Sequence, residues 1–447
     1  MEANVVVIGG SAAGLTAAIT ARRHYPDKSV LVVRREQQVL IPCGIPYIFG
    51  TVGSPEKDLI PDAVLEKNKL DLLVAEATGI DPKAKTVHAA DGDVRYDRLI
   101  VATGSLPAVP PIPGIDLDGV FAILKDVEHM RKIQQRLAEA DDVVIIGGGF
   151  IGIEFADEIN KAGGRNITIV EILPHCLSLA YDDEFCVEME ELLASRGMKI
   201  RTSAKVEKIQ GAERVESVLL ADGSEIKADV VILGIGAVAN AELAKDAGLR
   251  IGAGGGVAVD RAMATSDPAI FACGDCAEKF SFFGGGPCEL KLASIAELEA
   301  RIAGANLFGI TRENFGTVGV WSTAVGDMAL GTAGLTEAMA RDRGYEVITA
   351  SIDGPNRHPG GMPGAVNLKM KLVFEANSGV LLGGQVRGDA AAGEIINAVS
   401  ACVQKRMTAE EIATFQIGTH PALTASPIAY PLVNAAEMAI GQMRKGA

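Results

Sequence analysis

Two stretches of the chain share one pattern of hydrophobic positions: a short apolar run, a glycine-rich turn and then helical periodicity. The first covers residues 4–15 (NVVVIGGSAAGL) and continues into Ala17, Ala18 and Ala21. The second covers residues 142–154 (DVVIIGGGFIGIE). A continuous apolar run bounded by turn residues is typical of a buried strand in a parallel sheet. The pattern therefore predicts an α/β protein with two related strand–turn–helix units.

The glycines in both turns have the spacing of a dinucleotide-binding fingerprint. In the first turn, Gly9 permits the tight bend and Gly14 the close contact of helix and strand, although Ser11 replaces the middle glycine. The second turn is complete, with Gly147, Gly149 and Gly152. Backbone N–H groups at such a helix start can hold a pyrophosphate. Two fingerprints in one chain indicate two nucleotide sites.

The residues that end each following strand differ between the two units. Strand 167–170 ends in Glu171, where a carboxylate accepts hydrogen bonds from a ribose 2′-hydroxyl and repels a 2′-phosphate. We therefore expect NADH in preference to NADPH at the second site. Strand 30–33 ends in Arg34 and Arg35 before Glu36, so the sequence leaves open how the first site holds its ribose.

Composition and charge narrow the class of protein. The 447 residues are too many for one core and favour about three domains, and a formal net charge of −15 disfavours nucleic acid as a partner. No stretch reaches 18 uncharged apolar residues, and the chain enters its first strand without a basic-then-apolar leader. Seven irregularly spaced cysteines fit a reducing compartment. We expect a cytoplasmic protein with no membrane partner.

Two further segments also read as strand, turn and glycine. These are residues 96–104 (YDRLIVATG) and 265–275 (TSDPAIFACGD), the second ending in an aspartate suited to a ribityl hydroxyl. In this order, the four motifs resemble the pyridine nucleotide-disulfide oxidoreductases over essentially the whole chain. The resemblance implies an FAD domain (1–118 and 245–322) interrupted by an NAD domain (119–244) and followed by an α+β dimerisation domain (323–447). A proline-rich connector at 107–114 independently supports the first boundary.

The resemblance also assigns the nucleotide contacts. It implies that FAD is bound by Gly9, Ser11, Ala12, Ala13, Gly14, Glu36, Cys43, Thr103, Gly104, Gly274 and Asp275. It implies that the nicotinamide cofactor is bound by Gly147, Gly149, Phe150, Ile151, Gly152, Glu154 and Glu171. Phe150 resembles an aromatic gate that moves aside for nicotinamide, or else it is packing. Glu154 is either a nicotinamide-pocket residue or a charge that complements the helix dipole.

Cys43, in the segment IPCGIPY, is the candidate redox centre. A redox thiol reacts as thiolate and needs a lowered pKa, which a helix N-terminus or a neighbouring flavin can provide. The alternative is a buried structural cysteine, but the flanking nucleotide motifs favour the redox role. Ile48 stands where the two-cysteine branch of the family has its second thiol. The chain therefore resembles the single-cysteine branch.

That branch includes coenzyme A-disulfide reductases, coenzyme A-dependent persulfide or polysulfide reductases, and NADH oxidases and peroxidases. The CGIPY string is most similar to the coenzyme A-linked enzymes, and Ala12 stands where oxidases and peroxidases carry a histidine that steadies a sulfenate. We therefore predict an FAD-dependent NADH reductase of small disulfides, persulfides or polysulfides. The alternatives are an oxidase or peroxidase that cycles Cys43 through sulfenic acid, and a flavoprotein electron-transfer reductase.

The remaining candidates come from the C-terminal region and from the first helix. The resemblance implies a homodimer in which His420 or Tyr430 of one subunit serves as acid/base at the thiol of the other, and the sequence leaves both open. Arg22 and Arg23 are candidates for the 3′-phosphate of coenzyme A, or they simply favour a helix C-terminus. Cys273 and Cys276 form a lone CxxC within a flavin motif, so we predict no metal site. His175 and Cys176 are interpreted as incidental.

Overall fold

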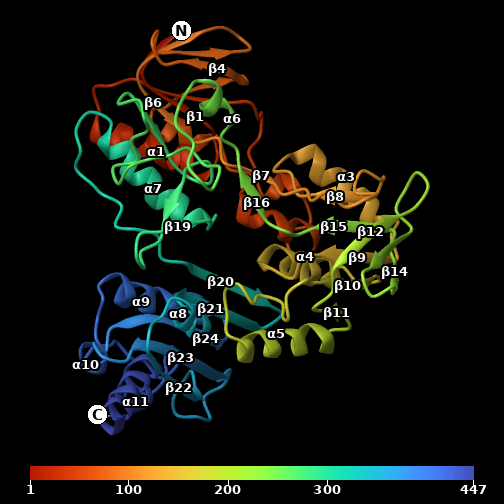
Figure 1. Ribbon diagram of the computed structural model, residues 1–447, viewed down its shortest axis with the longest axis vertical. Helices are drawn as coiled ribbons and strands as arrows, with labels where there is room; N and C mark the ends of the chain where they lie inside the picture. The colour runs from red at the N-terminus through yellow and green to blue at the C-terminus, as the bar shows by residue number, and fades with distance from the viewer. Residues whose placement is uncertain (447) are drawn as a thin grey trace.

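The computed structural model describes residues 1–446, so the last residue of the expected C-terminal domain lies outside the description. Figure 1 shows three bodies: an α/β body at the top that contains the N-terminus, a second α/β body at the right, and a C-terminal body in blue at the bottom. The chain leaves the first body for the second and then returns, because segments coloured red and green lie together at the top. This arrangement confirms the expected fold class.

The first body is built on a seven-stranded sheet with the order β3-β2-β1-β6-β5-β4, in which β17 also pairs with β6. The strands are β1 (Glu2–Ile8), β2 (Val30–Arg34), β3 (Asp71–Val74), β4 (Ala77–Asp81), β5 (Thr86–Ala89), β6 (Val94–Val101) and β17 (Ile270–Ala272). All neighbours are parallel except in the β4–β5–β6 portion. Helices α1 (Ala12–His24) and α7 (Ala293–Asn306) pack against each other beside this sheet. The returning strand β17 therefore completes the sheet that β1 begins.

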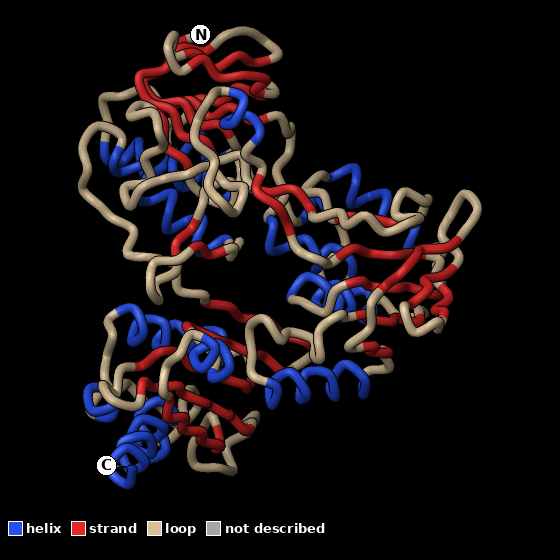
Figure 2. The backbone as a smooth tube through the Cα atoms, in the orientation of Figure 1, coloured by secondary structure: helices blue, strands red, loops and turns tan. Residues whose placement is uncertain are grey.

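The second body has a fully parallel five-stranded sheet, β11-β10-β9-β15-β8. Its strands are β8 (Val120–Ala122), β9 (Asp142–Ile146), β10 (Asn166–Val170), β11 (Lys199–Arg201) and β15 (Val230–Leu233). Its helices are α3 (Val127–Ala138), α4 (Phe150–Lys161) and α5 (Asp183–Ser195). An antiparallel sheet of β12 (Val206–Gln210), β13 (Ser217–Leu220) and β14 (Glu225–Lys227) lies beside it. Figure 2 shows helices in blue beside red strands in both α/β bodies.

A two-stranded ribbon joins the first two bodies. Strand β7 (Ser105–Pro107) leaves the first body, and β16 (Ala237–Ala239) returns to it, and the two pair antiparallel with Leu106 opposite Val238. The proline-rich segment 107–114 follows β7 directly. Both crossings between the bodies therefore lie side by side.

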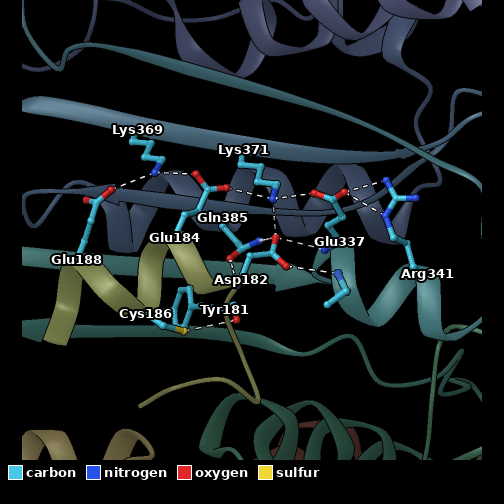
Figure 3. A network of polar contacts seen from close by, with 11 residues as sticks. Tyr181, Asp182, Glu184, Cys186, Glu188, Glu337, Arg341, Lys369, Lys371 and Gln385 are labelled. Atoms are coloured by element: carbon cyan, nitrogen blue, oxygen red, sulfur yellow. Dashed lines mark hydrogen bonds and ion pairs between the residues drawn. The ribbon is translucent and has the colours of Figure 1, made fainter. Parts of the chain in front are cut away.

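The C-terminal body is an antiparallel sheet with the order β20-β21-β24-β23-β22. Its strands are β20 (Val320–Val325), β21 (Met328–Gly334), β22 (Val347–Pro355), β23 (Asn367–Glu375) and β24 (Leu381–Gly388). Helices α9 (Ala392–Gln404) and α11 (Pro431–Gly446) pack against it. Its remaining helical segments are α8 (Glu337–Asp342), α10 (Ala409–Ala413) and η3 (Pro427–Ala429). Figure 3 shows α5 of the second body lying against this sheet.

The short elements connect these layers. They are η1 (Pro42–Phe49), η2 (Pro55–Lys57), α2 (Ala63–Lys67), α6 (Glu242–Asp246), β18 (Lys279–Phe280) and β19 (Pro287–Cys288). None of the helices in residues 1–446 combines the length and apolarity that crossing a membrane requires.

Candidate active site

Cys43 is the second residue of the short helix η1. Pro42 opens the helix, where its fixed φ is favourable and its missing N–H costs nothing. Ile45, Ile48 and Phe49 are buried, and they anchor η1 in the core that it shares with the second body. Cys43 itself stays exposed. The local sequence therefore fixes a short helix and leaves its first turn, with the thiol, free to react.

Neighbours from two other segments hold η1 in place. A Cβ at Gly44 would lie 1.8 Å from Oδ1 of the buried Asp58, so only glycine fits beside the thiol. At the other end, Thr51 donates its backbone N–H to the buried Glu158 carboxylate of α4, at 2.6 Å. Helix α4, which follows the second glycine turn, therefore also supports the cysteine helix. No sequence motif points to Asp58 or Glu158.

One cavity of about 2060 Å³ connects Cys43 with both glycine turns. Single-ligand pockets commonly occupy about 300–1,000 Å³, so this one has room for two nucleotide cofactors. The predicted site residues that line it are Gly9, Ser11, Ala12, Ala13, Glu36, Cys43, Thr103, Gly104, Gly147, Gly149, Phe150, Ile151, Glu154, Glu171 and Asp275. Of the cysteines in the described chain, only Cys43 lines the cavity. A lone thiol thus shares one cavity with both nucleotide motifs.

The remaining fingerprint glycines lie behind this lining and shape the turns. Gly9 has φ +118°, and a Cβ at Gly14 would lie 1.9 Å from the carbonyl oxygen of Gly9. In the second turn, a Cβ at Gly152 would lie 1.9 Å from the carbonyl oxygen of Gly147. Helix and strand therefore approach as closely as the sequence predicts, and the turns suit a bound pyrophosphate at the starts of α1 and α4.

Arg34, the last residue of β2, and Arg35, which follows it, have separate environments. Arg34 is buried, pairs with both carboxylate oxygens of Asp62 at 2.8 and 2.9 Å, and donates to the carbonyls of Glu36 and Gln37. Arg35 pairs with Glu36 at 2.9 Å, and both line the cavity. Arg34 therefore shapes the loop, while Glu36 is available to a ribose from two positions after the acidic position of the fingerprint, which Arg34 occupies.

The last flavin motif is fixed from behind by a buried ion pair. Gly274 donates its N–H to Glu299 of α7 at 2.9 Å and accepts from Lys279 at 2.7 Å, and these two side chains pair at 3.3 Å. Asp275 lines the cavity, where it accepts a hydrogen bond from Ser105 at 2.7 Å. Cys273 and Cys276 are buried in the core behind the motif. The pair Lys279–Glu299, which no motif predicts, therefore presents the Gly274–Asp275 turn to the cofactor.

The pKa of the Cys43 thiol is set by desolvation and acidic neighbours more than by positive charge. Although Cys43 is exposed to the cavity, the surrounding protein partly desolvates its thiol and so raises the pKa. The Glu154 carboxyl raises this pKa further, and Lys125 acts in the opposite direction. Burial likewise raises the pKa of Glu154 to about 7, although Thr323 donates a hydrogen bond to it at 2.8 Å. The chain's own side chains thus disfavour the thiolate that the sequence argument requires. Stabilisation of the thiolate would then have to come from a bound cofactor, with Lys125 as a nearby side chain that lowers the pKa.

The part of the cavity beside the second glycine turn contains an aromatic residue, Trp321, that the motifs did not single out. Phe150 stacks on Trp321 of β20, with ring centroids 6.0 Å apart and planes at 14°. Trp321 is the only tryptophan in the sequence, which is a signal that could have drawn attention to it. His175, interpreted from the sequence as incidental, also lines the cavity and pairs with Glu190 at 3.2 Å, whereas Cys176 is buried.

Glu171 is held by both of its carboxylate oxygens. It accepts N–H groups from Gly148 at 2.5 Å and from Leu173 at 2.7 Å, and it is buried at the cavity wall. These two bonds fix a negative charge beside the second glycine turn. A ribose 2′-hydroxyl can donate to such a carboxylate, whereas a 2′-phosphate meets like charge.

Changing Glu171→Gln is therefore expected to lower the preference for NADH over NADPH by about tenfold to a hundredfold, the value of a hydrogen bond to a charged group. The glutamine keeps the shape and one acceptor for the backbone N–H groups. The measurement is the ratio of kcat/KM for the two cofactors. A ratio equal to that of the unmodified protein would contradict the assignment.

Besides Gly14, Gly152 and Gly274, four candidates from the sequence do not line the cavity of the single chain: Arg22, Arg23, His420 and Tyr430. Arg22 donates to the carbonyls of Lys28 at 2.6 Å and Lys69 at 2.7 Å, so the fold already engages it, while Arg23 is exposed. His420 is exposed between α10 and η3. Tyr430 is half-buried against the C-terminal core, and burial raises its pKa.

Two nucleotide turns and a lone thiol around one cavity define a nucleotide-dependent thiol oxidoreductase. A family model described as pyridine nucleotide-disulphide oxidoreductase matches residues 3–300, and its dimerisation domain matches residues 320–428. The chain belongs to the pyridine nucleotide-disulfide oxidoreductase family. The FAD and NAD(P)H of this family fit the residues present, since the cavity joins both glycine turns and the Gly274–Asp275 motif.

Several relatives are similar over nearly their full length. An NADH oxidase of Methanocaldococcus jannaschii is 32% identical over 98% of this chain and 99% of its own. An NAD(P)H coenzyme A polysulfide/persulfide reductase of Pyrococcus horikoshii is 36% identical over 87% of this chain and 88% of its own. Among solved structures, an NAD-dependent persulfide reductase from A. fulgidus superposes with a TM-score of 0.91 at 33% identity, covering 100% of this chain and 84% of that one.

Proposed function

We propose that the protein is an FAD-dependent NADH reductase of small disulfides, persulfides or polysulfides, acting on coenzyme A derivatives through Cys43. The observation that carries this proposal is the single cysteine lining a cavity that joins both nucleotide turns. The names of the Pyrococcus horikoshii and A. fulgidus relatives support it. The proposed domain boundaries are those expected from the sequence, and the reducing cytoplasm suits an enzyme with a free catalytic thiol.

In the proposed reaction, bound FAD supplies a two-electron relay between NADH and the thiol site. The Cys43 thiolate attacks one sulfur of a disulfide, forms a mixed disulfide and expels the other half as a thiolate, which takes up a proton. Two electrons from NADH then cleave the mixed disulfide, restore the Cys43 thiolate and release the second half. NADH, one proton and one disulfide thus give NAD⁺ and two thiols. With a persulfide, the products are one thiol and hydrogen sulfide.

The charges around Cys43 make its ionisation depend on the bound cofactor. Burial and Glu154 raise the pKa of the thiol in the chain itself. The protein without its cofactor is therefore expected to keep a protonated Cys43 thiol. The thiolate is expected only when the cofactor is bound. Because Cys43 has no second cysteine in the cavity, the substrate half must stay attached until the electrons arrive.

We propose that the active unit is a homodimer whose proton donor, His420 or Tyr430, comes from the partner subunit. The chain carries the family's dimerisation domain. Around these two residues the single chain exposes large apolar side chains, with Leu423 71% and Ile428 87% exposed. Exposed apolar side chains of this size suit burial against another subunit. The raised pKa of Tyr430 keeps its hydroxyl protonated and able to donate.

Mixed dimers test this arrangement. One subunit carries Cys43→Ser and the other carries both His420→Ala and Tyr430→Phe, so one site per dimer combines the intact residues of both chains. Such heterodimers, isolated with two affinity tags, are expected to recover about half of the activity of the unmodified dimer, although each parent homodimer is inactive. Heterodimers as inactive as their parents would contradict a shared site.

The proposed coenzyme A contact rests on fewer residues than the thiol site. Arg23 is exposed near the C-terminal end of α1, and a guanidinium suits a phosphate group. Both terminal nitrogens of the Arg22 guanidinium donate to backbone carbonyls and its Nε is buried, so Arg23 is the better placed of the two. The measurement that checks this proposal is the KM for coenzyme A disulfide in Arg23→Gln, which should rise while kcat is unchanged.

The alternative proposal is an NADH oxidase or peroxidase in which Cys43 cycles through sulfenic acid. The name of the Methanocaldococcus jannaschii relative favours it. Against it, Ala12 lines the cavity at the first glycine turn and has no side-chain donor for a sulfenate. The third possibility, an electron-transfer reductase, makes Cys43 dispensable.

Anaerobic titration of the purified protein with NADH, followed by absorbance, tests these proposals. A long-wavelength thiolate–flavin band after addition of two electrons, with turnover only when coenzyme A disulfide or polysulfide is added, is the expected result. Fast NADH consumption with oxygen alone would favour the oxidase. The lack of any such band would favour the electron-transfer reductase.

A further inference from the structure

The C-terminal sheet presents one row of side chains to the second body. Trp321 on β20 is paired with Thr332 on β21, Thr332 with Gln385 on β24, and Gln385 with Lys371 on β23. Directly paired residues on neighbouring strands point to the same face of a sheet. Trp321, Gln385 and Lys371 therefore share the face that meets the second body.

One end of this row contacts the start of α4. The ring of Trp321 stacks on Phe150, the first residue of that helix, and both line the cavity. Two residues further along β20, on the same face, Thr323 donates to Glu154 at 2.8 Å, four residues further along α4. Residues two apart on a strand share a face, and so do residues four apart on a helix. The two contacts therefore fix one face of β20 against one face of α4.

The other end of the row holds the segment before α5. Asp182 donates its N–H to Gln385 at 2.7 Å, and its carboxylate accepts from Gln385 at 2.6 Å and pairs with Lys371 at 3.0 Å. Figure 3 shows these side chains converging between α5 and the sheet, with Tyr181 directly beside Asp182. The fully buried Tyr181 ring in turn contacts Phe150, with centroids 6.1 Å apart.

These contacts link the two aromatic neighbours of Phe150 to each other. The ring has Trp321 on one side and Tyr181 on another, and the Gln385–Asp182 pair ties the supports of both together. Phe150 lines the same cavity as Cys43 and Glu171. A ligand ring that takes the place of the Phe150 ring in this cavity breaks the stack on Trp321.

We propose that the Phe150 ring rests on Trp321 when no nicotinamide is bound, and we call this arrangement the closed state. Gln385 and Asp182 are positioning residues that keep the two rings stacked. The C-terminal domain then takes part in nicotinamide binding within the same subunit, because opening the site breaks the Phe150–Trp321 stack. This inference rests on the proposed function in taking NAD as the ligand. An aromatic stack of this kind is worth about a twofold to tenfold change in affinity.

The single tryptophan makes the proposal measurable in the oxidised holoenzyme with NAD⁺ as the probe, because NAD⁺ does not reduce the flavin. Binding is followed independently by perturbation of the flavin absorbance. In the unmodified protein, NAD⁺ is expected to change the emission of Trp321. In Phe150→Leu, the free protein should already show the emission of the NAD⁺-saturated form, and NAD⁺ should produce no further change.

Affinity gives the second readout. Trp321→Leu should bind NAD⁺ about twofold to tenfold more tightly, because no stack has to be broken, and Trp321→Phe should bind as the unmodified protein does. Gln385→Leu should shift affinity in the same direction as Trp321→Leu. The matched control is Lys369→Met, which loses its pairs with Glu184 and Glu188 in the same network but touches neither Tyr181 nor Asp182. It should leave NAD⁺ affinity unchanged.

The outcomes separate this inference from the proposed function. NAD⁺ binding with an unchanged Trp321 emission, or an affinity in Trp321→Leu that is equal to or weaker than that of the unmodified protein, would overturn the closed state. An equal effect of Lys369→Met and Gln385→Leu would overturn the positioning role of Gln385. A flavin spectrum that does not respond to NAD⁺ in any variant would contradict the proposed function and this inference together.

Discussion

Replacing Cys43 by serine is expected to lower disulfide or persulfide turnover by at least about 10³-fold, while FAD remains bound. A serine hydroxyl cannot form the mixed disulfide, and no other cysteine in the described chain lines the cavity to take its place. The variant changes one atom at an exposed position, so the fold should persist. Steady-state rates with coenzyme A disulfide and the anaerobic absorbance spectrum after NADH addition are the measurements.

A control variant separates the loss of a reactive thiol from the loss of any thiol. Cys288→Ser changes a partly buried cysteine on β19 that lies outside the cavity lining, and it should keep turnover and spectrum. In Cys43→Ser, the long-wavelength band should be absent even though the flavin is reduced by NADH. Preserved turnover in Cys43→Ser would eliminate the thiol mechanism and favour the electron-transfer alternative.

Replacing Lys279 by methionine is expected to destabilise the protein by about 3–5 kcal/mol at pH 8, the usual cost of leaving one partner of a buried ion pair uncompensated. The side chains of Lys279 and Glu299 are 2% and 0% exposed, and both hold the Gly274 peptide of the flavin motif. The variant should therefore also release FAD more readily. Thermal unfolding and the bound-FAD content after gel filtration measure the two effects.

The pH dependence of that loss has a definite sign. Burial raises the pKa of Glu299 from 4.5 to about 7, so between these values the folded state binds more protons than the unfolded chain. Stability from this group is therefore fully present below about pH 4.5 and is lost as the pH rises through about 7. Below pH 7 the Glu299 carboxyl is largely neutral, and Lys279→Met should cost less there than at pH 8.

Two further variants give the controls. Lys279→Met combined with Glu299→Gln removes both charges and should recover much of the stability, because no buried charge is left unpaired. Arg301→Met breaks an exposed pair with Glu297 on the same helix and should cost less than about 1 kcal/mol. An equal loss in Lys279→Met and Arg301→Met would contradict the role given to the buried pair.

The sequence by itself predicted the parts of the site that are encoded by local pattern. Apolar runs followed by glycine turns identified both nucleotide units, and a Cβ at Gly14 or Gly152 has no room in the structure. The family resemblance supplied the domain order and the fold class. The flanking motifs made Cys43 the candidate thiol. These features can be read from the sequence because strand, turn and helix follow one another within about 30 residues.

Contacts made by side chains outside these motifs were not predictable in this way. Lys279 and Glu299 hold Gly274 through side chains that match no motif, and Glu158 reaches Thr51 from another domain. Arg34, which occupies the position of the ribose-binding acid, is buried and pairs with Asp62. The raised pKa of the Cys43 thiol also follows from burial and from Glu154, two effects that depend on the assembled cavity.

The sequence therefore determined the cofactor class, the order of the motifs and the single thiol, because each depends on residues that are neighbours along the chain. The tertiary structure alone decided what surrounds them. It placed Trp321 of the C-terminal sheet on Phe150 of the second domain, with the pair Asp182–Gln385 behind them. Such contacts join positions more than 150 residues apart, and only the folded chain brings their side chains within reach.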